Sequence, residues 1–236
     1  MKNNKPNGYF DYISFPDREK RDYIRKTFFD TQCLKIDEQS VSSIDITTSD
    51  FDKFDFTYKL RNKVLFFNNT VCYLELAILQ MVNYFYLFDE KSDSEDLLCY
   101  SLLYRQSCRN VSCEIFIYEE KIKDIICLII KHVNCLKKLD DKKLMSEFTK
   151  VCKNTPYRLI FLDAIKEYHK NENVVEIKNF RNNEVHNESN LFINYENNAQ
   201  FNNYLFNKIQ NCLFAMVKLK TCFESFLLSF VNEMTG

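Results

Sequence analysis

The chain has 236 residues, of which only two are glycine, Gly8 and Gly236. The stretch 9–235 therefore cannot contain a dinucleotide-binding G-x-G-x-x-G loop, a Walker A loop or a G-x-S-x-G nucleophile elbow, because each of these needs glycine for positive φ or close backbone approach. A net charge of −1 gives no general basic field for nucleic acid, so any such contact must be local. With only three prolines as well, long helices are the simplest interpretation.

The N-terminal quarter of the chain differs in pattern from the rest. Residues 17–29 (DREKRDYIRKTFF) predict a short charged helix. Residues 40–58 are rich in Ser, Thr and Asp with loose alternation, which fits either an irregular arm or one or two short strands. The period becomes helical from Lys59. We therefore expect an N-terminal arm over 1–58 and a helical domain over 59–236.

Apolar residues at three- and four-residue steps predict a series of helices after Lys59. The segments with this pattern are 60–88, 95–104, 114–136, 144–152, 157–170 and 174–186. We expect polar breaks at 89–93, 140–143 and 171–173, and a polar, Asn-rich loop over 187–203.

The last segment is the most regular. Its apolar residues alternate three- and four-residue steps from Phe206 to Phe230, and only Lys220 interrupts them, which is typical of a bundle or coiled-coil seam. The expected fold class is all-α: an antiparallel helical bundle of four or five main helices with an irregular N-terminal arm.

The ten cysteines include no C-x-x-C pair, and most lie in apolar periodic segments. Cys72, Cys99, Cys127 and Cys212 are expected to act as small buried hydrophobic residues. The N-terminus has no apolar stretch typical of a secretion signal, and charged residues interrupt the most apolar windows. We therefore expect a cytoplasmic protein with reduced thiols and no membrane span.

One sequence pattern resembles a metal site. Cys127, His132 and Cys135 form C-x4-H-x2-C, but the first two positions lie about 140° apart on a helix. No second pair of ligands stands out elsewhere, so neither a metal nor any other cofactor is expected. No flanking motif marks a cysteine as a nucleophile.

Carboxylate pairs and one histidine are interpreted as surface features. Glu119-Glu120 and Asp140-Asp141 lie among lysines, as on solvated helix faces. His169 lies in KEYHKNEN, which is typical of a solvated helix end.

The segment 176–190 (EIKNFRNNEVHNESN) carries the chemistry that stands out. It contains Arg181, Asn182 and His186 in the pattern R-N-x3-H. Arginine provides a permanently charged fork suited to phosphate, and histidine can both take and give a proton near neutral pH. An amide beside the arginine can orient a substrate oxygen. These groups suffice for phosphodiester cleavage without a metal, in which the imidazole moves protons and the guanidinium stabilises charge on phosphorus.

This segment resembles the HEPN (higher eukaryote and prokaryote nucleotide-binding) superfamily, whose members carry an R-x(4–6)-H motif near the end of an all-helical domain. The resemblance covers roughly residue 60 to the C-terminus and matches Arg181 and His186 to the two defining positions and Asn182 to the polar one. It implies a metal-independent endoribonuclease that acts as a homodimer, with RNA cut at a composite site to leave a 2',3'-cyclic phosphate. Many members are toxins or phage-defence effectors, so an antitoxin partner is possible.

The residues also allow other interpretations. RNNEVHNES could be a polar helix end on the surface, and the chain could be a non-catalytic HEPN-like interaction module that dimerises through residues 204–231. Because positions 181 and 186 lie about 140° apart on a regular helix, they converge only if the helix ends or distorts there, or if a partner chain supplies the other half. Further candidate RNA contacts are Arg105, Arg109 and Lys178; the first two lie in YRQSCRN, which could equally be a solvated face.

Overall fold

The computed structural model describes residues 14–37, 51–90, 97–134, 141–151, 156–186 and 198–235. Within these ranges every regular element is a helix and no strand is present, which confirms the all-α prediction.

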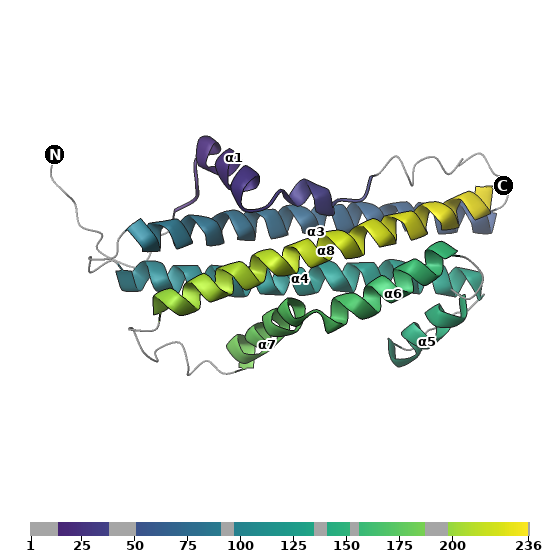
Figure 1. Cartoon of the computed structure of the whole chain (residues 1–236). Coiled ribbons are helices and arrows are strands. Elements are labelled where there is room, and N and C mark those ends of the chain that lie inside the picture. Colours follow the sequence, from purple (N-terminus) through teal and green to yellow (C-terminus); the bar gives the residue numbers. More distant parts are fainter. Residues whose placement is uncertain are drawn as a thin grey trace.

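Three long helices make up most of the molecule: α3 (Phe51–Glu90), α4 (Leu97–Val133) and α8 (Asn198–Thr235) (Figure 1). Two shorter helices, α6 (Pro156–Lys170) and α7 (Glu172–His186), follow one another along one side. In Figure 1, α3 and the α6–α7 pair run in one direction and α4 and α8 in the other, so the bundle is antiparallel as expected. The remaining helical elements are α1 (Arg18–Thr27), the 3-10 turn η2 (Thr31–Leu34) and α5 (Asp141–Val151).

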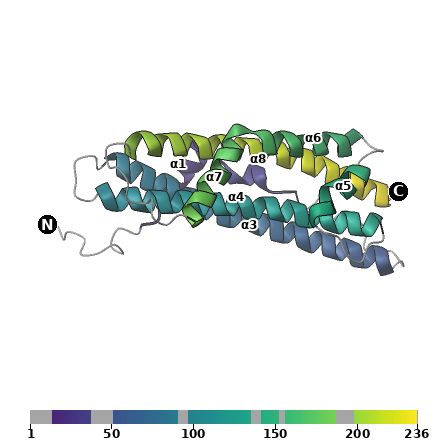
Figure 2. The same cartoon turned by 90° about the horizontal axis from the view of Figure 1, so that it is seen from below.

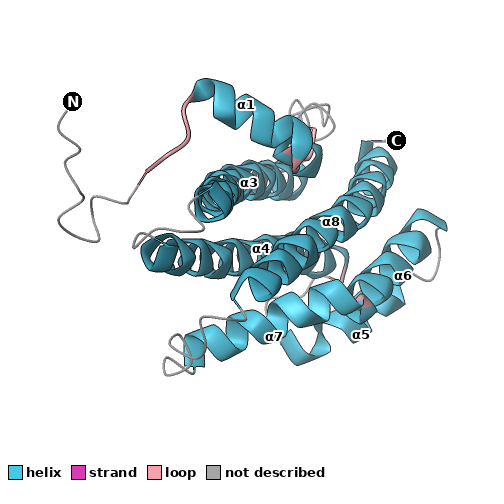
Figure 3. Cartoon of the chain, turned by 60° about the vertical axis from the view of Figure 1, so that its left-hand side comes forward, coloured by secondary structure: helices cyan, strands magenta, loops and turns pink. Residues whose placement is uncertain are grey.

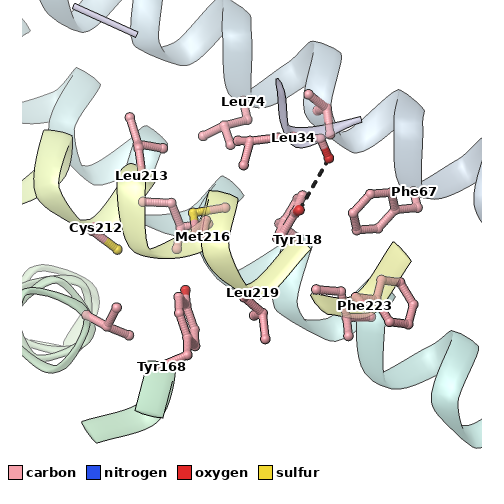
Figure 4. Close-up of a cluster of buried hydrophobic side chains, with 14 of the residues drawn as sticks. Leu34, Phe67, Leu74, Tyr118, Tyr168, Cys212, Leu213, Met216, Leu219 and Phe223 are labelled. Atoms are coloured by element: carbon pink, nitrogen blue, oxygen red, sulfur yellow. Dashed lines mark hydrogen bonds between the residues drawn. The ribbon is translucent and has the colours of Figure 1, made fainter. Parts of the chain in front are cut away.

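Aromatic rings fill the space between the long helices. Between α3 and α8 they meet at three levels, as the pairs Phe56–Phe230, Phe67–Phe223 and Phe85–Phe206. A second group joins α5, α6 and α8, where Phe161 lies 5.1 Å from Phe223 and 5.2 Å from Phe226, measured between ring centroids. Rings of this size bury large apolar areas and hold the helix axes apart. Figure 4 shows part of this core, with Phe67 and Tyr118 beside Phe223.

The seam predicted on the last helix is buried inside its own chain. Ile209, Leu213 and Met216 are fully buried, and Phe223 and Leu227 continue the buried face. These residues face α3, α4, α6 and the N-terminal segment, so the surface is already occupied. The buried residues of this seam therefore pack within the chain, and the alternative that the chain dimerises through residues 204–231 stays a prediction.

The N-terminal segment 14–37 packs onto the bundle. Phe28, Phe29, Leu34 and Ile36 belong to the same buried core as the long helices. Asn68 of α3 holds the segment in register, because its amide donates to the Ile36 carbonyl at 3.0 Å and accepts from the Ile36 N–H at 2.9 Å. The predicted helix over 17–29 is confirmed as α1, and Asp17 caps its first turn.

Several predicted boundaries differ from the structure. Residues 51–58 are helical, so both interpretations of that stretch are wrong there, and α3 crosses the expected arm boundary without a break. Residues 141–143 and 198–203 are also helical rather than turn and loop.

The helices expected over 95–104 and 114–136 are a single helix, α4. The intervening sequence RQSCRNVSC is polar, but Ser107 and Ser112 donate to carbonyls one turn earlier in α4, and Cys108 and Val111 are buried. The two serine hydroxyls are thus satisfied within the helix.

Cysteine burial also differs from expectation at one position. Of the four cysteines expected to be buried, Cys212 is buried, Cys99 and Cys127 are half-buried, and Cys72 is exposed on α3. The eight described cysteines are all free thiols.

Among the described residues, α3 alone is long and apolar enough to cross a membrane by length and composition. Over half (56%) of its most apolar window is buried within the bundle, as in the central helix of a folded domain.

The aromatic group gives a first prediction. Phe223→Ala should lower the free energy of unfolding by about 3–5 kcal/mol, because it leaves a cavity among Phe67, Phe161 and Phe226. Phe214→Ala, on the same helix but 56% exposed, should cost only about 1 kcal/mol or less. Urea unfolding followed by circular dichroism measures both, and equal losses would contradict the packing described.

Candidate functional site

The predicted motif lies on α7, which packs against α4 and α8 (Figure 2). Asn171, the break between α6 and α7, caps this helix, because its side-chain oxygen accepts from the N–H groups of Asn173 (3.0 Å) and Val174 (3.4 Å). The sharp change of direction between α6 and α7 thus needs no glycine. The predicted break over 171–173 is confirmed at Asn171 alone, because α7 already includes residues 172 and 173, and the predicted helix after it is confirmed.

Arg181 is held in place by two neighbours. Its guanidinium carbon lies 4.1 Å from the centre of the Phe116 ring of α4, which is cation–π geometry. One terminal nitrogen donates to the side-chain oxygen of Asn182 at 3.2 Å. The Nε atom is buried against α4 and has no hydrogen-bond partner among the described residues. The orientation of the guanidinium therefore depends on Phe116 of α4 as well as on α7, the helix that carries Arg181.

The other two motif residues lie further along α7. Asn182 is exposed. His186 is the last residue of the helix, and its side chain lies outside the described part of the structure. Since α7 continues through both positions, 181 and 186 are about 140° apart around the helix and about 7.5 Å apart along it. Within one chain, the backbone does not bring these two positions to the same face.

One turn before Arg181, the Lys178 ammonium takes part in a partly buried polar cluster. It lies 2.8 Å from one carboxylate oxygen of Glu119 and 3.1 Å from Nδ1 of His169. The Tyr168 hydroxyl donates to the other Glu119 oxygen at 2.7 Å. Glu119 is only 4% exposed, so its interpretation as part of a solvated face is wrong, whereas His169 is exposed as expected. The sequence carried no signal for this cluster, since its members come from α4, α6 and α7.

Burial sets the proton affinities in this cluster. It raises the pKa of the Tyr168 phenol well above its usual value, and Cys212 and Glu119 add to the effect, so this hydroxyl stays a donor. Burial also raises the pKa of the neighbouring Cys212 thiol to about 12, which makes this cysteine a poor nucleophile at neutral pH. Although the residue is exposed as a whole, the pKa of His169 is lowered, first by partial desolvation of its ring in the pocket wall and then by the charge of Lys178. A neutral His169 ring can accept the hydrogen bond from Lys178 at Nδ1.

A small pocket, open to solvent, lies next to this cluster between α4, α5, α6 and α8. Glu119, Tyr168 and His169 form part of its wall, and the rest is mostly apolar. Because both Glu119 oxygens already have partners, the pocket offers few free polar groups.

The candidate RNA contacts are spread along the line where α7 meets α4. The helices are antiparallel there, so Lys178 lies by Glu119 and Arg181 by Phe116. Further along α4, Arg105 stacks over the Phe201 ring of α8 at 5.1 Å. Glu184 and Arg105 both act electrostatically on the Cys108 thiol, so the end of α7 approaches this stretch of α4. Arg109, one turn from Arg105, is half-exposed.

This line spans about 20 Å, from position 105 to position 119 of α4, at 1.5 Å per residue. Three cationic side chains, at 105, 178 and 181, therefore share one strip of surface. Of these three, Lys178 is paired with the Glu119 carboxylate, and the two arginines lie over aromatic rings.

The described residues contain no cluster of three metal-ligating side chains. Within the C-x4-H-x2-C pattern, the His132 ring stacks on Phe56 at 3.9 Å, and Cys135 lies outside the described residues.

Comparison of the chain with protein-family models, curated proteins and solved structures finds no match. The resemblance to HEPN proteins therefore rests on the sequence motif and the expected helical layout, and it stays a prediction.

The Lys178–Glu119 pair can be tested by a double-mutant cycle. Lys178→Met should lower the free energy of unfolding by about 3–5 kcal/mol, because it leaves a buried carboxylate without its ion partner. Adding Glu119→Gln should recover part of this loss, since no uncompensated charge then remains. Lys218→Met, which breaks the exposed Lys218–Glu167 pair, should cost less than about 1 kcal/mol. No recovery in the double variant would contradict the pairing.

His169 should make stability depend on pH. Its pKa in the folded protein lies below the ordinary value of 6.5, so the unfolded chain binds the proton first as the pH falls. The contribution of the neutral His169 ring to the free energy of unfolding is fully present above pH 6.5. It is lost as the pH falls from 6.5 through the lowered pKa of the folded protein. Urea unfolding of the wild type and His169→Gln between pH 7.5 and 5 should show a smaller loss for the variant. Parallel curves would contradict the assignment.

Proposed function

We propose that this protein is a metal-independent endoribonuclease of the HEPN type, active as a homodimer. The observation that carries the proposal is the setting of Arg181: its guanidinium is fixed over Phe116 and bonded to the adjacent Asn182, on a helix that ends at His186. The all-α fold agrees with the resemblance. A cytoplasmic location and a role as a toxin or defence effector, with an antitoxin partner, belong to the same proposal.

Each motif residue has a role in this mechanism. His186 acts as general acid/base: it takes the proton of the RNA 2'-OH as that oxygen attacks phosphorus, or gives one to the departing 5'-oxygen. Arg181 stabilises the charge that builds on the phosphoryl oxygens. Asn182 orients the substrate. The products are a 2',3'-cyclic phosphate and a 5'-hydroxyl end, and no water or metal is consumed.

Fixing Arg181 on Phe116 supports this role. A free arginine side chain loses about 2 kcal/mol of rotamer entropy when it is ordered on a ligand. Stacking on the ring and bonding to Asn182 order the guanidinium before RNA binds, so less entropy is lost in the transition state.

The spacing within α7 favours a site shared by two chains. Positions 181 and 186 lie on different sides of one helix, and a two-fold pairing of α7 with its copy would allow Arg181 of one protomer to work with His186 of the other. The strip with Arg105, Arg109 and Lys178 then extends from the site as a path for RNA. Arg105 on Phe201 and Arg181 on Phe116 each join a cation to an aromatic ring, the combination that binds single-stranded bases and phosphates.

Single substitutions test the catalytic roles. Arg181→Ala and His186→Ala should each reduce cleavage of a fluorescent single-stranded RNA at least about 100-fold, the usual size of such catalytic contributions. Activity of the wild type should persist in EDTA. Arg18→Ala, which removes an exposed arginine on α1, serves as the charge-matched control and should cleave normally. Circular dichroism verifies that each variant is folded. If the Arg181→Ala and His186→Ala variants both cleave RNA at the wild-type rate, the proposal is ruled out.

Mixing the two inactive variants tests the composite site. In a heterodimer of Arg181→Ala with His186→Ala, one of the two sites keeps both Arg181 and His186. Mixed and re-equilibrated protein should regain about a quarter of wild-type activity, because half of the dimers are heterodimers with one intact site each. No recovery would show that both residues act from one chain.

A further inference from the structure

The outward face of α3 is apolar although no other described part of the chain covers it. Six exposed residues form what we call the outer face: Leu65, Phe66, Asn69, Cys72, Tyr73 and Leu76. Phe66 and Tyr73 are 63% and 62% exposed, and Leu76 is 48% exposed. Scattered apolar residues are normal on a surface, but a contiguous apolar patch marks an interaction site.

Charge is almost absent from this part of α3. Between positions 64 and 80 the sole charged residue is Glu75, and its carboxylate pairs with Arg25 of α1 at 2.6 Å. The outer face therefore has neither the basic residues typical of a helix that lies on a membrane surface nor a charged pattern that would select an oppositely charged partner.

The spacing of the outer face is that of a helix–helix seam. Phe66, Asn69, Tyr73 and Leu76 follow three-, four- and three-residue steps, and Leu65 and Cys72 flank them. The single polar member, Asn69, lies at the middle of the seam. A lone asparagine at one position of a coiled-coil seam is a known device for specifying register and oligomeric state.

We infer that the outer face of α3 pairs with the outer face of α3 in a second copy of this chain. A two-fold axis near Asn69 places each Asn69 beside its counterpart and sets apolar residues against apolar residues, with no like charges opposed. The face continues toward the start of α3 through Tyr58 and Phe54, which are also exposed, and there the exposed residues Lys59 and Arg61 lie beside it. Together these side chains expose roughly 700 Å² per protomer, close to the ~800 Å² per partner of a standard interface.

This contact is separate from the pairing proposed for the ribonuclease. α7 packs against α4 and α8, and Figure 3 shows α3 on the far side of these two helices. An α3 pair therefore leaves the α7 motifs exposed. The two pairings can form in the same assembly, because each uses a different surface of the chain. The inference does not rest on the ribonuclease activity.

The test is the molar mass in solution. Phe66→Glu/Tyr73→Glu places charges at the centre of the contact and should halve the wild-type mass, measured by light scattering after gel filtration at about 50 µM. The matched control is Tyr157→Glu on α6, where the tyrosine is 54% exposed outside the face, and it should keep the wild-type mass. Circular dichroism checks folding, and Phe66→Gln/Tyr73→Gln is the milder pair to use should the glutamates unfold the chain.

Three outcomes would overturn the inference: a monomeric wild type, a double variant with the wild-type mass, or an equal loss of mass in the Tyr157→Glu control. Flotation with phosphatidylcholine vesicles tests whether the face binds a membrane instead. If the wild type is monomeric and floats with the vesicles while the double variant does not, the face binds lipid and the inference is overturned. A double variant with the wild-type mass overturns the α3 pairing alone and leaves the ribonuclease proposal standing. A monomeric wild type would contradict both the α3 pairing and the homodimer proposed for the ribonuclease.

Discussion

The structure depends on aromatic packing between helices that cannot approach closely. Because no glycine occurs between residues 9 and 235, side chains separate the backbones of the described helices, and Phe and Tyr rings fill much of the space between them. α8 is the common partner: it meets α3 through Phe223 and Phe230, and α6 through the rings around Phe161. Such a core tolerates little loss of volume, because its density comes from a few large, interlocking groups.

The same packing leads to the candidate site. α6 is anchored on α8 by the aromatic group, Asn171 turns the chain, and the Glu119–Lys178 pair then holds α7 against α4. That register places Arg181 on Phe116. A buried ion pair is weak evidence for stability in itself, but its loss is costly, so it can fix one arrangement of two helices. The polar cluster is best understood as positioning α7 rather than as a second reactive centre.

The molecule has two contrasting surfaces on opposite sides. The α7 side is polar, with arginines stacked on aromatic rings, and suits a charged ligand such as RNA. The outer face of α3 is apolar and nearly uncharged, and suits a copy of itself. Our two proposals assign one contact between copies of the chain to each of these sides. Neither contact uses the most regular helical seam, because α8 buries that seam within its own chain.

Local periodicity by itself determined the all-α class, α6, α7, the break at Asn171 and the position of Arg181 and Asn182 on a polar helix, because helix formation and capping depend on neighbours in sequence. Local periodicity gave wrong predictions where contacts between distant helices decide whether a side chain is buried. The polar stretch after Arg105 stays helical because Cys108 and Val111 are buried. Glu119 is buried because Lys178 and Tyr168 meet it from other helices, whereas Cys72 is exposed because α3 is apolar on all sides and only packing decides which side faces solvent.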